Sequence, residues 1–463
     1  MAGQRLEVVE HDEAGRVTAT YVSSPTDTKG TSRVDVITPE KAKEPWQRLL
    51  DVFLPAGYPH SVTHDYLEYQ IYDSLQAFSS SIAGLLSSRA VLSSVGVGDS
   101  TASPTAALLL SILQESAGRV ATILFAHRFG TSLEPECKMY RLLADILNDF
   151  AFILDCLSPA FPKPIRVIIL SFSSVLRALC GVAAGSAKAS LSAHFARWGN
   201  LGELNAKDSS QETVISLLGM LAGSLVVSWV ETQTATWTVL ILLLSVHLET
   251  NRRAVRAVSM RTLSRQRATL LYHQLQRGIV AKPEDISKSE RIFDRDGVLR
   301  DVHGSITGWC AFESSIKALF DPQASMRRSR TGSLSVDSLH IERLLAIFEK
   351  RRYIVNVVPA SNQDLYQCQI FLKRGATTTD CLTAWWHCLA FVEAEKALRG
   401  QRTVSEVYYS PAGRKELLDL LEKLSPTIAE ILEKRGDALR AAGWDLEVNA
   451  LETGSSMRLS FND

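Results

Sequence analysis

An excess charge of either sign is missing from this sequence, and so is any paired arrangement of cysteines. The 463 residues include 50 Lys and Arg against 50 Asp and Glu, which gives a formal net charge of zero. No overall electrostatic field therefore favours nucleic acid, and we expect no nucleic-acid partner. The seven cysteines are odd in number and form no Cys-x-x-Cys pair. That pattern argues against a disulfide framework and against a zinc site.

Catalytic and cofactor signatures are also lacking. The sequence has no Ser-His-Asp order, no complete nucleotide-binding motif and no metal-ligand spacing. Cys381, His387 and Cys388 share one segment, but their spacing suits buried helix packing rather than metal binding. We therefore expect a non-enzymatic protein without a metal or a cofactor.

Long uninterrupted hydrophobic runs are absent as well, although four apolar segments follow one another. They cover residues 105–126, 165–187, 214–230 and 237–248. A membrane-spanning helix needs about 20 apolar residues, but the last two segments are shorter, and Arg119 and Arg177 interrupt the first two. Two interpretations remain open: a membrane-embedded bundle, which we favour, and a soluble bundle with very apolar cores.

Two of these segments carry glycines four residues apart, namely Gly181 with Gly185 and Gly219 with Gly223. This spacing lets helix backbones approach closely, as at helix interfaces in membranes. Residues 251–277 then hold seven arginines and no carboxylate. Since Arg-rich flanks of membrane helices stay on the cytoplasmic or equivalent side, we predict that the C-terminal part lies on that side of a membrane.

The pattern of the chain predicts four parts. Residues 1–45 are predicted to form an N-terminal hairpin and a loose linker, and residues 46–280 an apolar helical bundle. Residues 281–345 are predicted to be a linker with a flexible insertion at 320–338. Residues 346–463 combine β-rich runs with helices, which predicts a small α+β domain. The expected fold class is therefore mainly α, with a membrane-embedded bundle followed by this C-terminal domain.

Polar side chains line one face of each of two predicted helices. On the helix over residues 138–151, they fall within an arc of roughly 100° and include Lys138, Arg141, Asp145 and Asp149. This face is either solvated, with an Arg141–Asp145 ion pair along it, or turned inward to form a site. An inward face would meet the polar side of the helix over residues 63–92. That side carries Asp65, Tyr69, Tyr72, Asp73 and Gln76, opposite an apolar stripe of Leu67, Ile71, Leu75, Phe78 and Ile82.

A second polar group precedes the third apolar segment. Ser209 and Glu212 fit a capping box, with a hydroxyl at the N-cap and a glutamate three residues later, so they are predicted to cap a helix. Lys207 and Asp208 would lie just outside this helix N-terminus, where backbone amides attract anions. His194 and Asn200 are close in sequence, and together these side chains predict a site for a small anionic ligand.

Several ordered motifs resemble one known family. They are Phe53-Leu-Pro-x-Gly-Tyr-Pro-x-Ser-Val62, Asp65-Tyr-Leu-x-Tyr-Gln70, Arg141-Leu-x-Ala-Asp-x-Leu-Asn-Asp149, His194-Phe-Ala196 and Ala206-Lys-Asp-Ser-Ser-Gln-Glu-Thr213. With these motifs, residues 45–275 resemble the root UVB sensitive family, also called the vitamin B6 photo-protection and homoeostasis family. The resemblance implies a membrane protein without an established enzymatic activity, linked in plants to UV-B responses and vitamin B6 homeostasis.

Two functions agree with these features. The first is a non-enzymatic membrane protein that binds or transports a small anionic metabolite in vitamin B6 homeostasis or the UV-B response. Its candidate ligand-binding residues are Lys138, Arg141, Asp145, Asp149, His194, Asn200, Lys207 and Asp208. The alternative is a membrane-associated scaffold, whose C-terminal domain docks partner proteins. The partners expected besides the metabolite are other proteins or further copies of the chain in a homo-oligomer.

Overall fold

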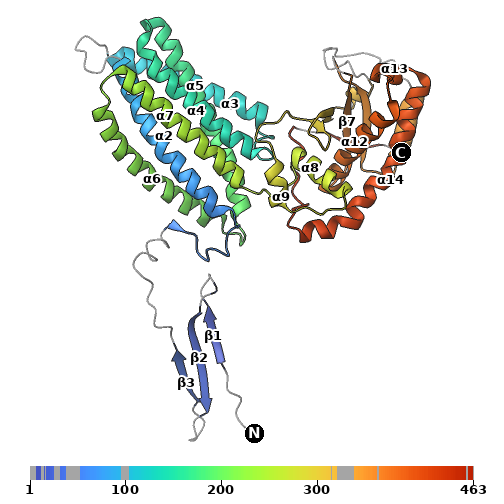
Figure 1. Cartoon of the computed structure of the whole chain (residues 1–463), viewed down its shortest axis with the longest axis horizontal. Helices are drawn as coiled ribbons and strands as arrows, with labels where there is room; N and C mark the ends of the chain where they lie inside the picture. The colour runs from blue at the N-terminus through green and yellow to red at the C-terminus, as the bar shows by residue number, and fades with distance from the viewer. Residues whose placement is uncertain are drawn as a thin grey trace. The chain divides into compact units, whose positions relative to one another are not determined.

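The computed structural model describes residues 7–11, 15, 17–25, 32–37, 53–94, 104–313, 315–320, 338–361, 364–454 and 457–461. The chain forms two compact units (Figure 1). The first unit comprises Met1–Thr122 and Arg141–Val258, and the second comprises Ile123–Tyr140 and Ser259–Asp463. The expected fold class is confirmed: long helices dominate, and a small sheet lies in the C-terminal part.

A three-stranded antiparallel sheet forms near the N-terminus. It consists of β1 (Glu7–His11), β2 (Val17–Pro25) and β3 (Ser32–Ile37), in that order. Strands β1 and β2 pair antiparallel, as the alternating sequence predicts for a hairpin. Strand β3 falls in the stretch that we expected to be a loose linker, where it pairs antiparallel with β2.

Long helices that run side by side make the bundle of the first unit (Figure 1). They are α2 (Tyr66–Ser94), α3 (Pro104–Phe129), α4 (Cys137–Leu157), α5 (Lys163–Phe195), α6 (Leu201–Trp229) and α7 (Gln233–Ala257), with a short 3₁₀ turn, η1 (Ser158–Ala160), after α4. Helix α2 packs against both α6 and α7. Helix α6 begins well before its apolar segment, and α7 extends beyond its apolar segment at both ends.

Prolines and hydroxyls set several helix starts. Pro104 is the first residue of α3, and a proline also stands in the first turn of α5, where its missing N–H costs no hydrogen bond. At α7, the side chain of Thr232 accepts a hydrogen bond from the backbone N–H of Ala235. These local signals fix where the helices begin, and the packing of their faces then fixes the bundle.

The bundle has the opposite polarity to that of an ordinary soluble protein. On α2, Leu67, Ile71 and Leu75 are between 43% and 52% exposed, whereas Tyr69 and Gln76 are buried. The same outward exposure of leucine and isoleucine recurs on α3, α6 and α7. Three helical stretches are long and apolar enough to cross a membrane, namely Leu108–Phe129, Lys163–Phe195 and Leu201–Trp229.

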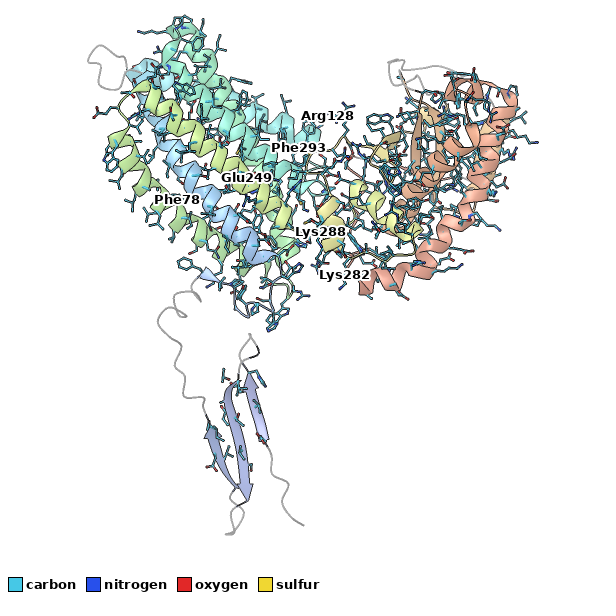
Figure 2. The ribbon with its side chains drawn as sticks, viewed as in Figure 1. Phe78, Arg128, Glu249, Lys282, Lys288 and Phe293 are labelled. Atoms are coloured by element: carbon cyan, nitrogen blue, oxygen red, sulfur yellow. The ribbon has the colours of Figure 1, made fainter. Side chains whose placement is uncertain are left out.

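The two glycine pairs have different surroundings. A Cβ added at Gly219 would lie 2.7 Å from the Cβ of Ser81, and 3.0 Å from the carbonyl oxygen of Phe78, which Figure 2 labels. Gly223 likewise faces α2, at the side chain of Leu85. By contrast, a Cβ at Gly181 would meet no atom within 4 Å. The predicted close helix contact therefore forms at the α6 pair, where it joins α6 to α2.

Arg89 makes hydrogen bonds at the connection between α6 and α7. Its guanidinium donates hydrogen bonds to the carbonyl oxygens of Val227 and Val230, and to the hydroxyl of Thr236. The last carbonyls of a helix have no partner within the helix, so this side chain satisfies two of them. It thereby ties α2 to the end of α6 and the start of α7.

The second unit is built around a small mixed sheet. The strands are β4 (Val298–Arg300), β5 (Ile306–Phe312), β6 (Tyr353–Pro359), β7 (Tyr366–Lys373) and β8 (Arg458–Leu459), in the order β4-β5-β7-β6, with β8 also pairing with β7. The helices are α8 (Arg265–Gln276), α9 (Pro283–Ser289), α10 (Lys317–Phe320), α11 (Ser338–Ile347), α12 (Thr378–Arg399), α13 (Val404–Tyr409) and α14 (Pro411–Ala441).

Helix α12 forms the centre of this unit. Trp385 and Trp386 are fully buried, and their indole N–H groups donate to the hydroxyl of Thr269 and the carbonyl of Ala268 on α8. Cys381, His387 and Cys388 are buried in the same helix, as predicted. Burial lowers the pKa of His387 to about 4, so this side chain is neutral.

The domain boundaries differ from those that we expected. Residues 281–345 were predicted to be a linker, yet α9, β4 and β5 fall within this range, and Ile286, Leu299 and Cys310 belong to the core of the second unit. Short elements of this kind carry little periodicity, and they become ordered by packing against α8 and α12. Of the insertion expected at 320–338, residues 321–337 lie outside the described residues.

Candidate functional site

The inward faces of α2, α4 and α7 bring together a cluster of polar side chains, here called the polar core. It consists of Tyr69, Asp73 and Gln76 on α2, Arg141, Asp145 and Asp149 on α4, and His247 and Asn251 on α7. The polar face predicted for residues 138–151 is therefore turned inward, and the solvated alternative is wrong. It meets the polar face of α2, as the ligand-site interpretation requires.

Arg141 connects α4 to α2 within the polar core. Its Nη2 atom donates to a carboxylate oxygen of Asp73 and, at 3.0 Å, to Oε1 of Gln76. Its Nη1 atom lies 3.4 Å from Oδ1 of Asp145, one helical turn along α4. The guanidinium is thus paired with two carboxylates at once, which offsets the cost of burying its charge.

Asp145 is the centre of the network. Its Oδ2 atom accepts hydrogen bonds from Nε2 of Gln76, at 2.6 Å, and from Nδ2 of Asn251. Gln76 is therefore a bridge, because its oxygen accepts from Arg141 while its amino group donates to Asp145. Three different helices meet at this one carboxylate.

His247 lies between two carboxylates of α4. Its Nδ1 atom is 2.7 Å from Oδ1 of Asp149, and its Nε2 atom is 3.6 Å from Oδ2 of Asp145. His247 is fully buried, and Asp149 is only 4% exposed. The contact between His247 and Asp149 is short but not aligned as a hydrogen bond, so neither Asp149 oxygen has an aligned donor among the described residues.

The charges of the polar core do not balance. Asp73, Asp145 and Asp149 supply three carboxylates against the single permanent cation of Arg141. A buried charge without a counter-charge is costly, so such groups bind a cation or take up a proton. The Oδ1 atom of Asn251 is a further buried acceptor without a donor among the described residues. The site therefore suits a partner that brings positive charge or N–H donors.

The second predicted site forms a separate polar group in the same unit. Asp208 is buried and accepts from Nε2 of Gln70, at 2.8 Å, and pairs with Lys188 at 2.8 Å. His194 lies 3.0 Å from a carboxylate oxygen of Asp65, and both are buried. These contacts tie the start of α2 to α5 and α6. Lys207 is half-buried on α6.

The predicted helix cap at Ser209 and Glu212 is wrong. Helix α6 begins at Leu201, so both residues lie in its interior. The carbonyl of Ser209 accepts from the hydroxyl of Thr213, and Glu212 pairs with Lys188 at 2.7 Å. Asn200 holds the N-cap position, but its side chain makes no capping hydrogen bond. The predicted helix start is too late because residues 201–208, which carry no apolar run, already belong to the helix.

Lys138 is assigned to the second unit, whereas the other predicted ligand residues are assigned to the first. Its Nζ atom lies 2.5 Å from Oε2 of Glu290 and 3.1 Å from the hydroxyl of Ser287. Arg267 pairs with the other oxygen of Glu290 at 2.7 Å. Lys138 therefore serves a buried ion-pair network around α9, which matches its burial.

This network predicts an acid-sensitive second unit. Burial raises the pKa of Glu290, but the charges of Lys138 and Arg267 outweigh it and hold the pKa below its ordinary value. The paired carboxylate thus stabilises the fold above about pH 4.5, and this contribution is lost as the pH falls below that value. Denaturant unfolding of wild type and Glu290→Gln across this range checks it. The stability difference between them should shrink in acid, and a constant difference would contradict the assignment.

Several residues of the polar core were missed by the sequence analysis as site residues. His247 and Asn251 stand one turn apart on α7, and the former lies inside the apolar segment 237–248. An ionisable residue within such a segment is by default a functional candidate, and this signal could have identified His247. Asp73 and Gln76 were recognised only as members of a polar helix face.

Comparison with known proteins identifies the family of this chain. The family described as "Vitamin B6 photo-protection and homoeostasis domain" matches residues 39–278, which contain the whole polar core. The chain belongs to the root UVB sensitive family. No solved structure matches it.

Relatives of this root UVB sensitive protein occur in different lineages. It is 38% identical to "RUS family member 1" of Dictyostelium discoideum over 291 residues, covering 62% of this chain and 55% of the relative. It is 36% identical to "Protein root UVB sensitive 3" of Arabidopsis thaliana over 249 residues, covering 53% and 56%. "Protein root UVB sensitive 2, chloroplastic" of the same plant is 28% identical over 273 residues, covering 58% and 62%. The chain thus spans a little over half the length of these relatives.

Proposed function

We propose that the first unit is a membrane-embedded helical module that holds a small polar metabolite at its polar core, as part of vitamin B6 homeostasis. The observation that carries this proposal is the polarity of the bundle. Polar side chains of α2, α4 and α7 face one another inside, while leucines and isoleucines of α2, α3, α6 and α7 face outward. Ionisable residues inside membrane bundles mark substrate or ion pathways.

Helix lengths support the membrane part of the proposal. The apolar stretch Leu108–Phe129 has 22 residues, which at 1.5 Å per residue extends about 33 Å, enough for a hydrocarbon core of about 30 Å. The candidate stretches in α5 and α6 are longer. Arg252, Arg253 and Arg256 follow the apolar part of α7. By the positive-inside rule we place the C-terminal unit on the cytoplasmic or equivalent side.

The charge of the polar core supports a particular kind of ligand. Three carboxylates face one guanidinium, so a ligand with a protonated nitrogen suits the site better than the anion that the sequence suggested. The core is closed in this arrangement, because Asp145, Asp149 and His247 are each less than 5% exposed. A metabolite would therefore enter only when α2 and α4 separate.

Carbonate extraction followed by calorimetry tests this function. The full-length protein is expected to stay in alkali-washed membranes and, once purified in detergent, to bind pyridoxine or pyridoxamine. Asp149→Asn should weaken binding by about tenfold or more, since hydrogen bonds to charged groups contribute about 1.5–3 kcal/mol. The matched control is Asp437→Asn, whose carboxylate is fully exposed on α14.

Each outcome bears on one part of the proposal. Release of the protein into the soluble fraction would overturn the membrane assignment, and equal affinity of the two variants would overturn the polar core as the binding site. Tighter binding of pyridoxal 5′-phosphate than of pyridoxine would support the anionic ligand that the sequence predicted. The scaffold alternative, with residues 346–463 as a docking surface, stays a prediction.

A further inference from the structure

The orientation of the Gln76 amide determines where the proton on His247 lies. One amide atom of Gln76 faces Arg141, which can only donate, so this atom is the oxygen. The other amide atom faces the carboxylate of Asp145, which accepts, so this atom is the nitrogen. Two independent partners therefore fix the same orientation, and the amide cannot turn without losing both hydrogen bonds.

This orientation constrains the His247 ring. Nε2 of Gln76 also lies 3.0 Å from Nε2 of His247. Since the amide nitrogen donates, Nε2 of the ring must accept with its lone pair, and the ring proton lies on Nδ1. Nδ1 lies 2.7 Å from Oδ1 of Asp149, close enough for a proton to pass between them although the contact is not aligned as a hydrogen bond. The arrangement is thus a neutral imidazole whose tautomer is set by Gln76, with Asp149 beside the protonated Nδ1 atom.

The surroundings of His247 favour the uptake of another positive charge. The ionisable groups that face this part of the core are Tyr69 and Asp73 on α2, Arg141, Asp145 and Asp149 on α4, and Cys180 on α5. With His247 neutral, the carboxylates exceed the cations by two. In the described part of the chain, no group of three His, Cys, Asp or Glu side chains has the geometry to hold a metal ion. A proton is the smallest charge that the closed core can admit.

We propose that His247 and Asp149 form a proton-carrying pair, and that a second proton on His247 releases the Gln76 bridge between α2 and α4. The proton binds the lone pair of Nε2 and gives an imidazolium. Its new N–H then points at the amino group of Gln76, and two donors cannot share a hydrogen bond. Asp145, with Oδ2 at 3.6 Å from Nε2, is the carboxylate that can accept from the imidazolium.

Release of a proton from the imidazolium to Asp149 completes the proton transfer. The imidazolium passes its Nδ1 proton to Oδ1 of Asp149, which leaves a neutral imidazole protonated at Nε2 and a neutral carboxylic acid. Loss of that proton from Asp149 then leaves the ring neutral in its other tautomer, with its proton on Nε2. One proton has then moved from the Asp145 side of the ring to the Asp149 side.

The pair would couple protons to the opening of the site. Gln76 holds Asp145 and Arg141 of α4 against α2, so its release loosens the contact that closes the core. This inference rests on the proposed function for its meaning, because the opening admits the metabolite. The protonation of His247 can nevertheless be measured without any ligand.

Nitrogen NMR of the full-length protein, labelled at histidine with ¹⁵N and held in lipid nanodiscs, tests the pair. The His247 signals are those missing from His247→Asn. In wild type at high pH, they are expected to show the tautomer with the proton on Nδ1, and the doubly protonated ring on acidification. Gln76→Met removes the donor to Nε2 and should shift the tautomer toward Nε2–H.

Asp149→Asn should lower the proton affinity of His247 by about tenfold, a shift of about one pH unit. The matched control is Asp155→Asn on the same helix, because Asp155 pairs with Arg177 and Ser87 instead; it should leave the His247 signals unchanged. A wild-type ring with its proton on Nε2, or one that never becomes doubly protonated, overturns the proposal without any variant. If the NMR agrees but pyridoxine does not bind, the ligand proposal fails and the proton pair stands.

Discussion

Replacing Arg141 with methionine is expected to destabilise the first unit by about 3–5 kcal/mol, the cost of leaving a buried charge without its partner. The side chain of Arg141 is 12% exposed, and those of Asp73 and Asp145 are 16% and 5% exposed. Methionine keeps much of the apolar stem but provides no positive charge. Two carboxylates would then face each other in the polar core, and one must become protonated for the bundle to close.

Denaturant unfolding of the full-length protein in detergent, followed by a probe of the bundle, measures this loss. The control is Arg119→Met, which makes the same change on α3. Its pair with Glu115 is 75% and 66% exposed, so the expected loss is below about 1 kcal/mol. The double variant Arg141→Met with Asp73→Asn should recover part of the stability. Equal effects of the two methionine variants would show that the polar core is not held by Arg141.

Replacing Gly219 with valine is expected to separate α6 from α2, at a cost of about 1–3 kcal/mol or more. The new Cβ would clash with the Cβ of Ser81 at 2.7 Å, and with the backbone oxygen of Phe78 at 3.0 Å. Neither obstacle is the free end of a flexible side chain, so the helices must move apart. The contact that Gly219 permits is the one the small-residue spacing predicts.

Gly181→Val is the matched control for this change. Gly181 has the same spacing to a second glycine, but a Cβ there meets no atom within 4 Å, so valine should alter stability by no more than about 0.5 kcal/mol. A cysteine pair at facing positions of α2 and α6, cross-linked in membranes, would report the separation directly. If valine is tolerated equally at both glycines, the close α2–α6 contact is absent in the protein.

The sequence predicts the polar face of α4 but not its direction. The 3.6-residue period places Arg141, Asp145 and Asp149 on one side of a helix whether that side meets water or another helix. In soluble proteins the polar face of a helix usually contacts water. In a bundle with an apolar exterior, the polar face points inward instead. The direction follows only from the partners, Gln76 and Asp73, which belong to a helix far away in the chain.

Local motifs were less informative where the helix had already begun. Ser209 and Glu212 match a capping box in type and spacing, but a motif of four residues cannot report that the helix starts at Leu201. His247 was overlooked for a related reason, since one histidine barely changes the hydropathy of an apolar segment. Its role depends on Asp149, and a contact at that sequence distance leaves no local trace.

The second unit is built from two separate stretches of the chain, residues 123–140 and 259–463, and this has a consequence for its synthesis. Lys138 leaves the ribosome 152 residues ahead of Glu290 (290 minus 138), and at about 5–20 residues per second this is a wait of about 8–30 s. During that time the segment 123–140 is present without the sheet and helices that complete its core. A messenger RNA truncated before the codon for residue 290 would therefore yield a chain that contains α4 but lacks Glu290, the carboxylate that pairs with Lys138.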